Sequence, residues 1–269
     1  MADSFQLEAI DAAIAGSMFA GKLNIFSTID STNTYAMQQA ANGAPHGTVY
    51  VADEQTAGRG RSDHAWHSEA NAGLYVSVLL RPQFIPADAL WLSLAAGLAV
   101  QQAVANVTGL VADIRWPNDL MLGDRKFGGI LTEMNAEVTR VRYAVIGIGI
   151  NVNHTRFPAE LRNAATSLCM ESDCAVSRQD LLIVLLRELH EEVSGLLEAA
   201  IFAEATHSIL QRLARKSSWI EGKRVSVEEA EGYTGVTAGL DPRGFLRVQT
   251  SNGVRTVLSG GVRKVGPGD

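Results

Sequence analysis

The chain carries a run of short, extended apolar segments with little helical sequence between them, and this pattern constrains its fold most. The segments predicted as strands are residues 47–55, 73–82, 111–116, 127–138 and 141–153. A polar stretch at Glu137–Arg140 joins the last two segments, which is typical of a hairpin. Consecutive strands of this kind favour an α+β fold over a doubly wound one. We therefore expect a mixed, largely antiparallel sheet packed with helices on one side.

Helical patterns occupy the remaining regular parts of the chain. The predicted helices cover residues 32–42, 88–107, 179–202 and 203–215. Ser31 is a good N-cap for the first of them. Polar residues interrupt the apolar stretch at 88–107, so we expect a buried helix there and no membrane span. Residues 155–178 are polar and irregular, which predicts a partly mobile loop.

The character of the sequence changes after Ser217. Short strands follow, separated by turn sequences at Asp241–Gly244 and Ser251–Gly253. This predicts a small all-β barrel over residues 217–269, which we expect to pack on the rest of the chain because so small a domain is marginally stable alone. We divide the chain into a short N-terminal helix and linker (1–22), a main domain (23–216) and this barrel.

Charge and cysteine content exclude several classes of function. The chain has 23 Lys+Arg and 29 Asp+Glu, a net charge of −6, which makes non-specific DNA binding a poor prediction. The two cysteines, Cys169 and Cys174, cannot build a disulfide scaffold or a four-ligand zinc site, and we expect reduced thiols in a cytoplasmic protein. The N-terminus has no early basic cluster, so no signal peptide is predicted.

The most informative segment alternates glycine and arginine, at Gly58-Arg59-Gly60-Arg61. Glycines allow the backbone to approach a ligand closely, and arginines bind carboxylate and phosphate. A solvated basic loop would have the same sequence. The preceding strand and Trp66 shortly afterwards favour an anion-binding site.

Two further segments carry side chains suited to phosphate and metal chemistry. Asn118 and Asp119 are expected to end a strand, where their oxygens suit Mg²⁺, although Pro-Asn-Asp is also an ordinary turn sequence. Lys126 follows as a compact positive charge in a predicted surface turn. Residues Gly147 and Gly149 would expose the backbone of a strand to a ligand, or would mark a bulge.

In this order, the motifs resemble those of biotin protein ligases. The matching elements are Ser31-Thr32-Asn33, Gln55, Gly58-Arg59-Gly60-Arg61, Trp66, Trp116-Pro117-Asn118-Asp119, Arg125-Lys126 and Gly147-Ile148-Gly149-Ile150-Asn151. The resemblance covers about residues 25–265. It implies the catalytic fold of this family, which is similar to class II aminoacyl-tRNA synthetases, followed by an SH3-like C-terminal barrel.

The resemblance also implies an activity. Such ligases activate biotin with ATP and Mg²⁺ to biotinyl-5′-AMP, and then transfer biotin to a lysine of the biotin carboxyl-carrier protein of acetyl-CoA carboxylase. Biotin and ATP would be substrates, and no bound prosthetic group is expected. The carrier protein would be the partner of this chain. An exposed sheet edge would also be compatible with a homodimer. The chain is not expected to bind DNA or a membrane.

The same resemblance assigns roles to individual residues. The residues expected to bind biotin are Ser31, Thr32, Asn33, Gln55, Arg59, Gly60, Arg61, Lys126, Gly147 and Gly149. The residues expected to bind ATP or the adenylate are Arg61, Trp66, Asn118, Lys126 and Asn151. Lys126, Arg61 and Asp119 would be catalytic, with Asp119 orienting or deprotonating the acceptor lysine. Asn118 and Asp119 would bind Mg²⁺.

One departure from the family pattern and three alternatives bear on these roles. His64 stands where the family pattern has a second arginine, which puts a phosphate contact from this position in doubt. His64 and His67 are also too few to form a zinc site, because zinc needs three or four ligands. A biotin-sensing repressor is disfavoured because about 22 residues before the first motif are too few for a winged helix. A lipoate or octanoate ligase is disfavoured by the arginine loop with Trp66, and a non-catalytic biotin sensor by the presence of Lys126 and Asp119.

Overall fold

The structure is a computed structural model that describes residues 5–61, 64–229, 231–258 and 260–265. Its larger sheet has seven strands in the order β1-β2-β3-β7-β6-β5-β4. The strands are β1 (Leu23–Ile29), β2 (Val49–Gln55), β3 (Gly73–Leu80), β4 (Asp113–Arg115), β5 (Asp119–Leu122), β6 (Arg125–Ala136) and β7 (Val141–Asn151). Strands β1 and β2 pair in parallel, and the other neighbours pair antiparallel. The predicted mixed, largely antiparallel sheet is therefore confirmed.

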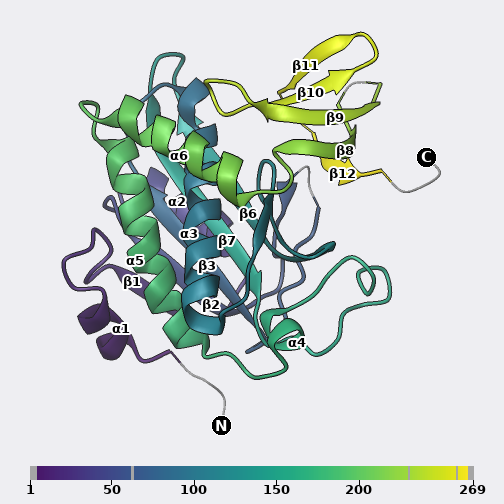
Figure 1. Cartoon of the computed structure of the whole chain (residues 1–269). Coiled ribbons are helices and arrows are strands. Elements are labelled where there is room, and N and C mark those ends of the chain that lie inside the picture. Colours follow the sequence, from purple (N-terminus) through teal and green to yellow (C-terminus); the bar gives the residue numbers. More distant parts are fainter. Residues whose placement is uncertain (1–4, 62–63, 230, 259, 266–269) are drawn as a thin grey trace.

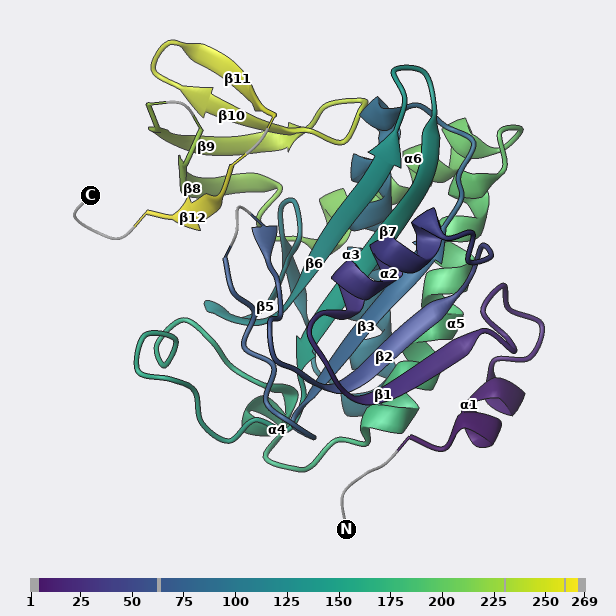
Figure 2. The same cartoon turned by 180° about the vertical axis from the view of Figure 1, so that it is seen from behind.

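Helices cover both faces of this sheet (Figures 1 and 2), whereas the sequence had indicated helices on one side. Helices α3 (Leu90–Thr108) and α5 (Arg178–Leu197) pack together on one face, with α6 (Phe202–Lys216) beside them. Helix α2 (Thr32–Ala41) lies on the opposite face, over β3 and β7. The short helices η2 (Pro86–Asp88) and α1 (Leu7–Ala13) complete this part of the chain, and Ile10 of α1 is fully buried in the main core.

Helix α3 is buried in the core, as the sequence predicted. The stretch Pro86–Thr108 is long and apolar enough to cross a membrane, but 67% of its apolar window is buried inside the protein. At Gly97 the helix packs against the sheet, where a Cβ would make an ordinary van der Waals contact of 3.5 Å with a methyl group of Ile114. Gly109, in the left-handed conformation, ends the helix. The apolar character of α3 is therefore explained by packing.

The C-terminal residues form a five-stranded antiparallel sheet in the order β11-β10-β9-β8-β12. Its strands are β8 (Glu221–Val227), β9 (Tyr233–Leu240), β10 (Leu246–Thr250), β11 (Gly253–Val257) and β12 (Val262–Lys264). This sheet packs on the main part of the molecule, where Trp116 donates its indole N–H to the carbonyl oxygen of Gly244, at 2.9 Å. The expected all-β unit is present, whereas the exact boundaries of the three predicted domains stay a prediction.

Three local expectations are corrected by the structure. Asn118 and Asp119 do not end a strand, because β4 ends at Arg115 and Asp119 begins the short strand β5. Lys126 lies in β6 rather than in a surface turn. The segment 155–178 contains helix α4 (Leu168–Ser172), which Ser167 caps by accepting a hydrogen bond from the Met170 N–H. Strands β1 and β5 were not predicted.

Candidate active site

The beginning of helix α2 forms the floor of a polar cavity. Ser31 caps the helix by accepting a hydrogen bond from the Thr34 N–H, as predicted. Thr32 donates through its hydroxyl to Gln55 Oε1 at 3.0 Å, and its backbone N–H donates to the same oxygen at 2.9 Å. The hydroxyl of Ser77, fully buried on β3, lies 2.8 Å from both Thr32 Oγ1 and Asn33 Oδ1. Hydroxyl and amide groups from α2, β2 and β3 thus meet at one point.

The two glycines of β7 are required by side chains that lie against them. A Cβ at Gly147 would fall 2.2 Å from Asn33 Oδ1, and one at Gly149 would fall 2.6 Å from Trp66 Nε1. Both distances are far below a van der Waals contact, so a larger residue would displace Asn33 or Trp66. The neighbours of the two glycines are thus the protein's own side chains, and contact of this strand with a ligand stays a prediction.

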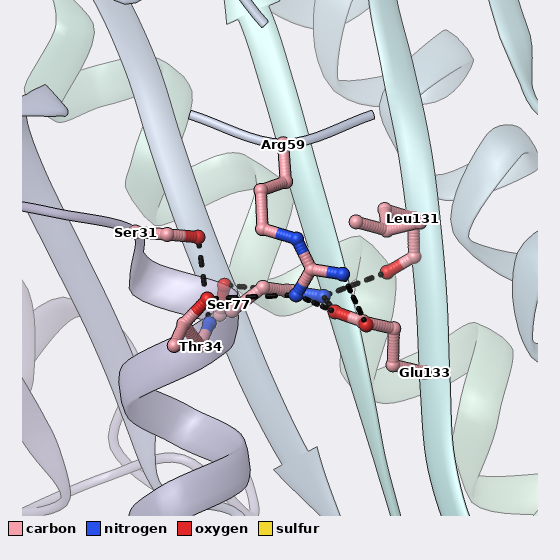
Figure 3. Close-up of polar contacts among 7 residues, drawn as sticks. Ser31, Thr34, Arg59, Ser77, Leu131 and Glu133 are labelled. Atoms are coloured by element: carbon pink, nitrogen blue, oxygen red, sulfur yellow. Dashed lines mark hydrogen bonds and ion pairs between the residues drawn. The ribbon is translucent and has the colours of Figure 1, made fainter. Parts of the chain in front are cut away.

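Arg59 extends across the sheet toward β6 (Figure 3). Its Nη2 lies 3.1 Å from Glu133 Oε1, and its Nη1 lies 3.3 Å from Glu133 Oε2. Asn33 donates its amide N–H to the same Glu133 Oε2, at 2.8 Å. Glu133 therefore connects the arginine loop to the start of α2.

A cluster of three cations surrounds Asp119 and Asn118. Arg115 donates to Asp119 Oδ2 through Nη2 at 2.6 Å and through Nε at 3.0 Å, and Lys126 Nζ pairs with Asp119 Oδ1. Arg61 donates to Asn118 Oδ1 at 3.0 Å. Burial alone would raise the pKa of Asp119, but the positive charges of Lys126 and Arg115 outweigh it and lower this pKa. The carboxylate is therefore ionised and bound on both oxygens.

Two adjacent cavities open at these residues. The narrow cavity, about 50 Å³, is lined by every residue predicted to bind biotin. The wide cavity, about 410 Å³, is lined by every residue predicted to bind the adenylate, and also by Asp119 and His64. The residues that line both cavities are Gly60, Arg61, Trp66, Asn118 and Lys126. Cationic side chains thus lie at the junction of the two cavities.

Some groups near the cavities were not assigned from the sequence. Arg115, Ser77 and Glu133 were given no role from the sequence. Ser77 carries a detectable signal, since it is the one small polar side chain in the strand Gly73–Leu80, whose other residues are glycine, aliphatic residues and Tyr75. Asn151 is buried, and its amide donates to the carbonyl oxygen of Thr166 at 3.0 Å. Residues 62 and 63 of the arginine loop lie outside the described residues.

The predicted Mg²⁺ ligands do not fit a metal site as they are arranged here. Both oxygens of Asp119 already bind cationic side chains, and Asn118 Oδ1 accepts from Arg61. A divalent cation at this point would face three positive charges with no oxygen left free in this pair of residues. We therefore derive no step through a metal ion held by Asn118 and Asp119.

Comparison with known proteins identifies the family. The family model described as Biotin/lipoate A/B protein ligase matches residues 25–151, and the Biotin protein ligase C terminal domain matches residues 222–264. The bifunctional ligase/repressor BirA of Bacillus spizizenii is 36% identical over 236 residues, which cover 86% of this chain and 70% of that protein. The chain belongs to the biotin protein ligase family.

Further relatives of this family agree in name and in structure. The biotin--[acetyl-CoA-carboxylase] ligase of Mycobacterium tuberculosis is 34% identical over 244 residues, covering 88% of this chain and 86% of that protein. The biotin protein ligase of Aquifex aeolicus, solved in complex with biotin and ATP, superimposes with a TM-score of 0.76 at 30% identity. That match covers 91% of this chain and 100% of the Aquifex chain. The chain is thus a ligase with the predicted catalytic fold and C-terminal domain.

Proposed function

We propose that this protein joins biotin to AMP at the expense of ATP and then transfers biotin to a lysine of the biotin carboxyl-carrier protein of acetyl-CoA carboxylase. One observation carries the proposal. Arg61 and Lys126 lie at the junction of a narrow polar cavity and a wide cavity. The names of the relatives and the Aquifex complex with biotin and ATP support these substrates.

The narrow cavity suits the ureido ring of biotin. This ring presents one carbonyl acceptor and two N–H donors. Complementary groups are offered by Ser31 and Thr32 at the start of α2 and by Gln55 at the end of β2. With the ring there, the carboxylate of biotin would extend toward Arg61 and Lys126.

The first step brings two anions together. A carboxylate oxygen of biotin attacks the α-phosphorus of ATP, a C–O–P linkage forms, and pyrophosphate leaves as the bond between the α-phosphorus and the bridging oxygen breaks. Arg61 and Lys126 would offset the repulsion and stabilise the charge that develops on the phosphate. Positioning in adjoining cavities can lower the barrier by about 7–11 kcal/mol, so no covalent enzyme intermediate is required.

The second step transfers biotin to the acceptor. A neutral lysine amine attacks the acyl carbon, AMP leaves with the electron pair of the broken C–O bond, and the amine proton passes to water. The sequence suggested Asp119 for orienting or deprotonating this amine. Because Asp119 is bound on both oxygens and its pKa is lowered, we infer instead that it positions Lys126. A weak base of this kind would remove a proton poorly.

A direct assay separates this proposal from the lipoate alternative. We measure ATP–pyrophosphate exchange in parallel with biotin and with lipoate as the acid substrate. Exchange should proceed with biotin and not with lipoate. Faster exchange with lipoate or octanoate would favour the other branch of the family, and no exchange with either would favour a non-catalytic biotin sensor.

Several finer features belong to the same proposal. Mg²⁺ would accompany ATP on its phosphates, without ligands from Asn118 or Asp119. The free thiols Cys169 and Cys174 support a cytoplasmic location, where thiols stay reduced. The absence of DNA and membrane binding and the formation of a homodimer stay predictions.

A further inference from the structure

A group of metal-ligating side chains lies beside the wide cavity, where the segment after Trp66 meets the end of β7. It consists of His67, Glu69 and His154, and one ligand atom of each lies within 4.8 Å of the other two. His67 Nε2 is 3.7 Å from Glu69 Oε2. None of these three side chains has a role in the steps proposed above. We call this group the His67–Glu69–His154 cluster.

His154 carries the most unusual feature of the cluster. Its side chain is only 1% exposed, and neither ring nitrogen has a hydrogen-bond partner within the described residues. A buried polar group without a partner costs about 1–3 kcal/mol, so such a group needs an explanation. The ring stacks on Phe157 with centroids 5.3 Å apart, and the ring of His67 lies 5.6 Å away. Packing therefore holds the imidazole at the cluster.

The protonation state of His154 suits a ligand. Burial, and secondarily the neighbouring His67, lower the pKa of His154 to about 4. The ring is thus neutral at neutral pH, which is the form that binds a metal ion. The backbone of Glu69 is held in place, because its carbonyl oxygen accepts a hydrogen bond from the Tyr75 hydroxyl at 3.0 Å.

We propose that His67, Glu69 and His154 form a three-ligand site for a divalent transition metal, with Zn²⁺ the best match. Two imidazoles and one carboxylate are a ligand set that zinc accepts, with water in the fourth position. Tetrahedral zinc would hold its ligand atoms about 3.4 Å apart, so the present separations must shorten. The side chains of His67 and Glu69 are 33% and 47% exposed and have room to make that movement.

The site would connect two parts of the wide cavity. His67 directly follows Trp66 and lines this cavity itself, and His154 lies three residues after Asn151. A bound metal ion would therefore tie the segment that carries Trp66 to the end of the strand that carries Asn151. The sequence did not reveal this site, because the third and buried ligand is 87 residues away from His67 along the chain.

Metal titration of the full chain tests the proposal. Metal-stripped protein is titrated with Co²⁺ while the visible absorption of tetrahedral cobalt is recorded, and Zn²⁺ affinity is measured by competition with a chromophoric chelator. We expect one equivalent to bind, and His67→Gln and Glu69→Gln each to weaken binding at least tenfold. Both side chains are partly exposed, so these variants should fold. Zn²⁺ should also raise the melting temperature of the unmodified protein and not that of the two variants.

His64→Gln is the matched control. His64 lies on the same loop, but its Nδ1 contacts the carbonyl oxygen of Arg61 at 2.8 Å, away from the cluster. This variant should bind Zn²⁺ as the unmodified protein does. Failure of the protein to bind one equivalent at micromolar metal would overturn the proposal. So would binding that His67→Gln and Glu69→Gln leave unchanged, whether or not biotin-dependent exchange is observed.

Discussion

At the scale of single residues, the site depends on how a few charges are paired. Lys126 and Arg115 share one carboxylate, that of Asp119, while Arg61 is held by a neutral amide. Arg61 can therefore exchange its partner for a phosphate without leaving a buried anion behind. Lys126 keeps its orientation through Asp119. This division of roles follows from the structure and could not be read from the motif alone.

Replacing Lys126 tests its part in the first step. Lys126→Ala should slow biotin-dependent ATP–pyrophosphate exchange by about 10²–10³-fold, the range found when one group that stabilises a transition-state charge is removed. Lys216→Ala, at the end of α6, is the control and should leave exchange unchanged. Exchange by Lys126→Ala at a rate close to that of the unmodified protein would remove Lys126 from the mechanism.

Replacing Glu133 tests whether the Arg59 contact shapes the narrow cavity. Glu133→Gln removes the charge that holds Arg59 and Asn33 together, so the KM for biotin should rise several-fold while kcat changes little. Glu137→Gln, an exposed position in the β6–β7 hairpin, should not alter either constant. An unchanged KM in Glu133→Gln would show that this contact does not matter for biotin.

At the scale of elements, the sequence revealed most of the sheet and the long helices. The apolar runs in the sequence predicted four strands, β2, β3, β6 and β7. These strands could be recognised because they are long and at least partly buried. Strand β5 has four residues between two turns, too few for a periodic pattern. Its position matters for the site, because the pairing of β4 with β5 places Arg115 opposite Asp119. The charge cluster was therefore hidden together with this strand.

The charge cluster predicts a specific pH dependence of stability. Neighbouring cations lower the pKa of folded Asp119 below its unfolded value near 3.8, so its stabilising contribution is complete above that value. The contribution is lost as the pH falls through the lower, folded pKa. Asp119→Asn should reduce the free energy of unfolding by about 2 kcal/mol.

Urea unfolding of both proteins between pH 8 and pH 3 measures this effect. The difference between the unmodified protein and Asp119→Asn should stay constant from pH 8 to about pH 5 and shrink below that. A difference that disappears by pH 6 would mean that another group is responsible.

At the scale of the whole molecule, the C-terminal sheet docks through a turn whose partners are distant in sequence. Gly244 has φ +85°, and its carbonyl oxygen accepts the Trp116 indole N–H. The position that a Cβ of Gly244 would occupy faces Trp91 and Leu94 of α3. The turn itself was predictable from its residues, but its docking partners were not, because they come together only in the folded chain.

Gly244→Ala tests this contact. A Cβ at Gly244 would lie 2.9 Å from Leu94 Cδ1, so overpacking should destabilise the protein by about 1–3 kcal/mol beyond the cost of a positive φ. Gly253→Ala is the matched control, since Gly253 has φ +107° and nothing within 4 Å of its Cβ position. Thermal unfolding of the two variants gives the difference. Equal losses of stability would show that docking does not depend on a close fit at this turn.

A crystal structure with biotin and a non-hydrolysable ATP analogue tests the central claim most directly. We expect the ureido ring in the narrow cavity beside Thr32 and Gln55, and the α-phosphate in the wide cavity. The biotin carboxylate should lie between them, within hydrogen-bonding distance of Lys126 or Arg61. Biotin bound away from these two cations, or with its carboxylate pointing toward Ser77, would contradict the proposed mechanism.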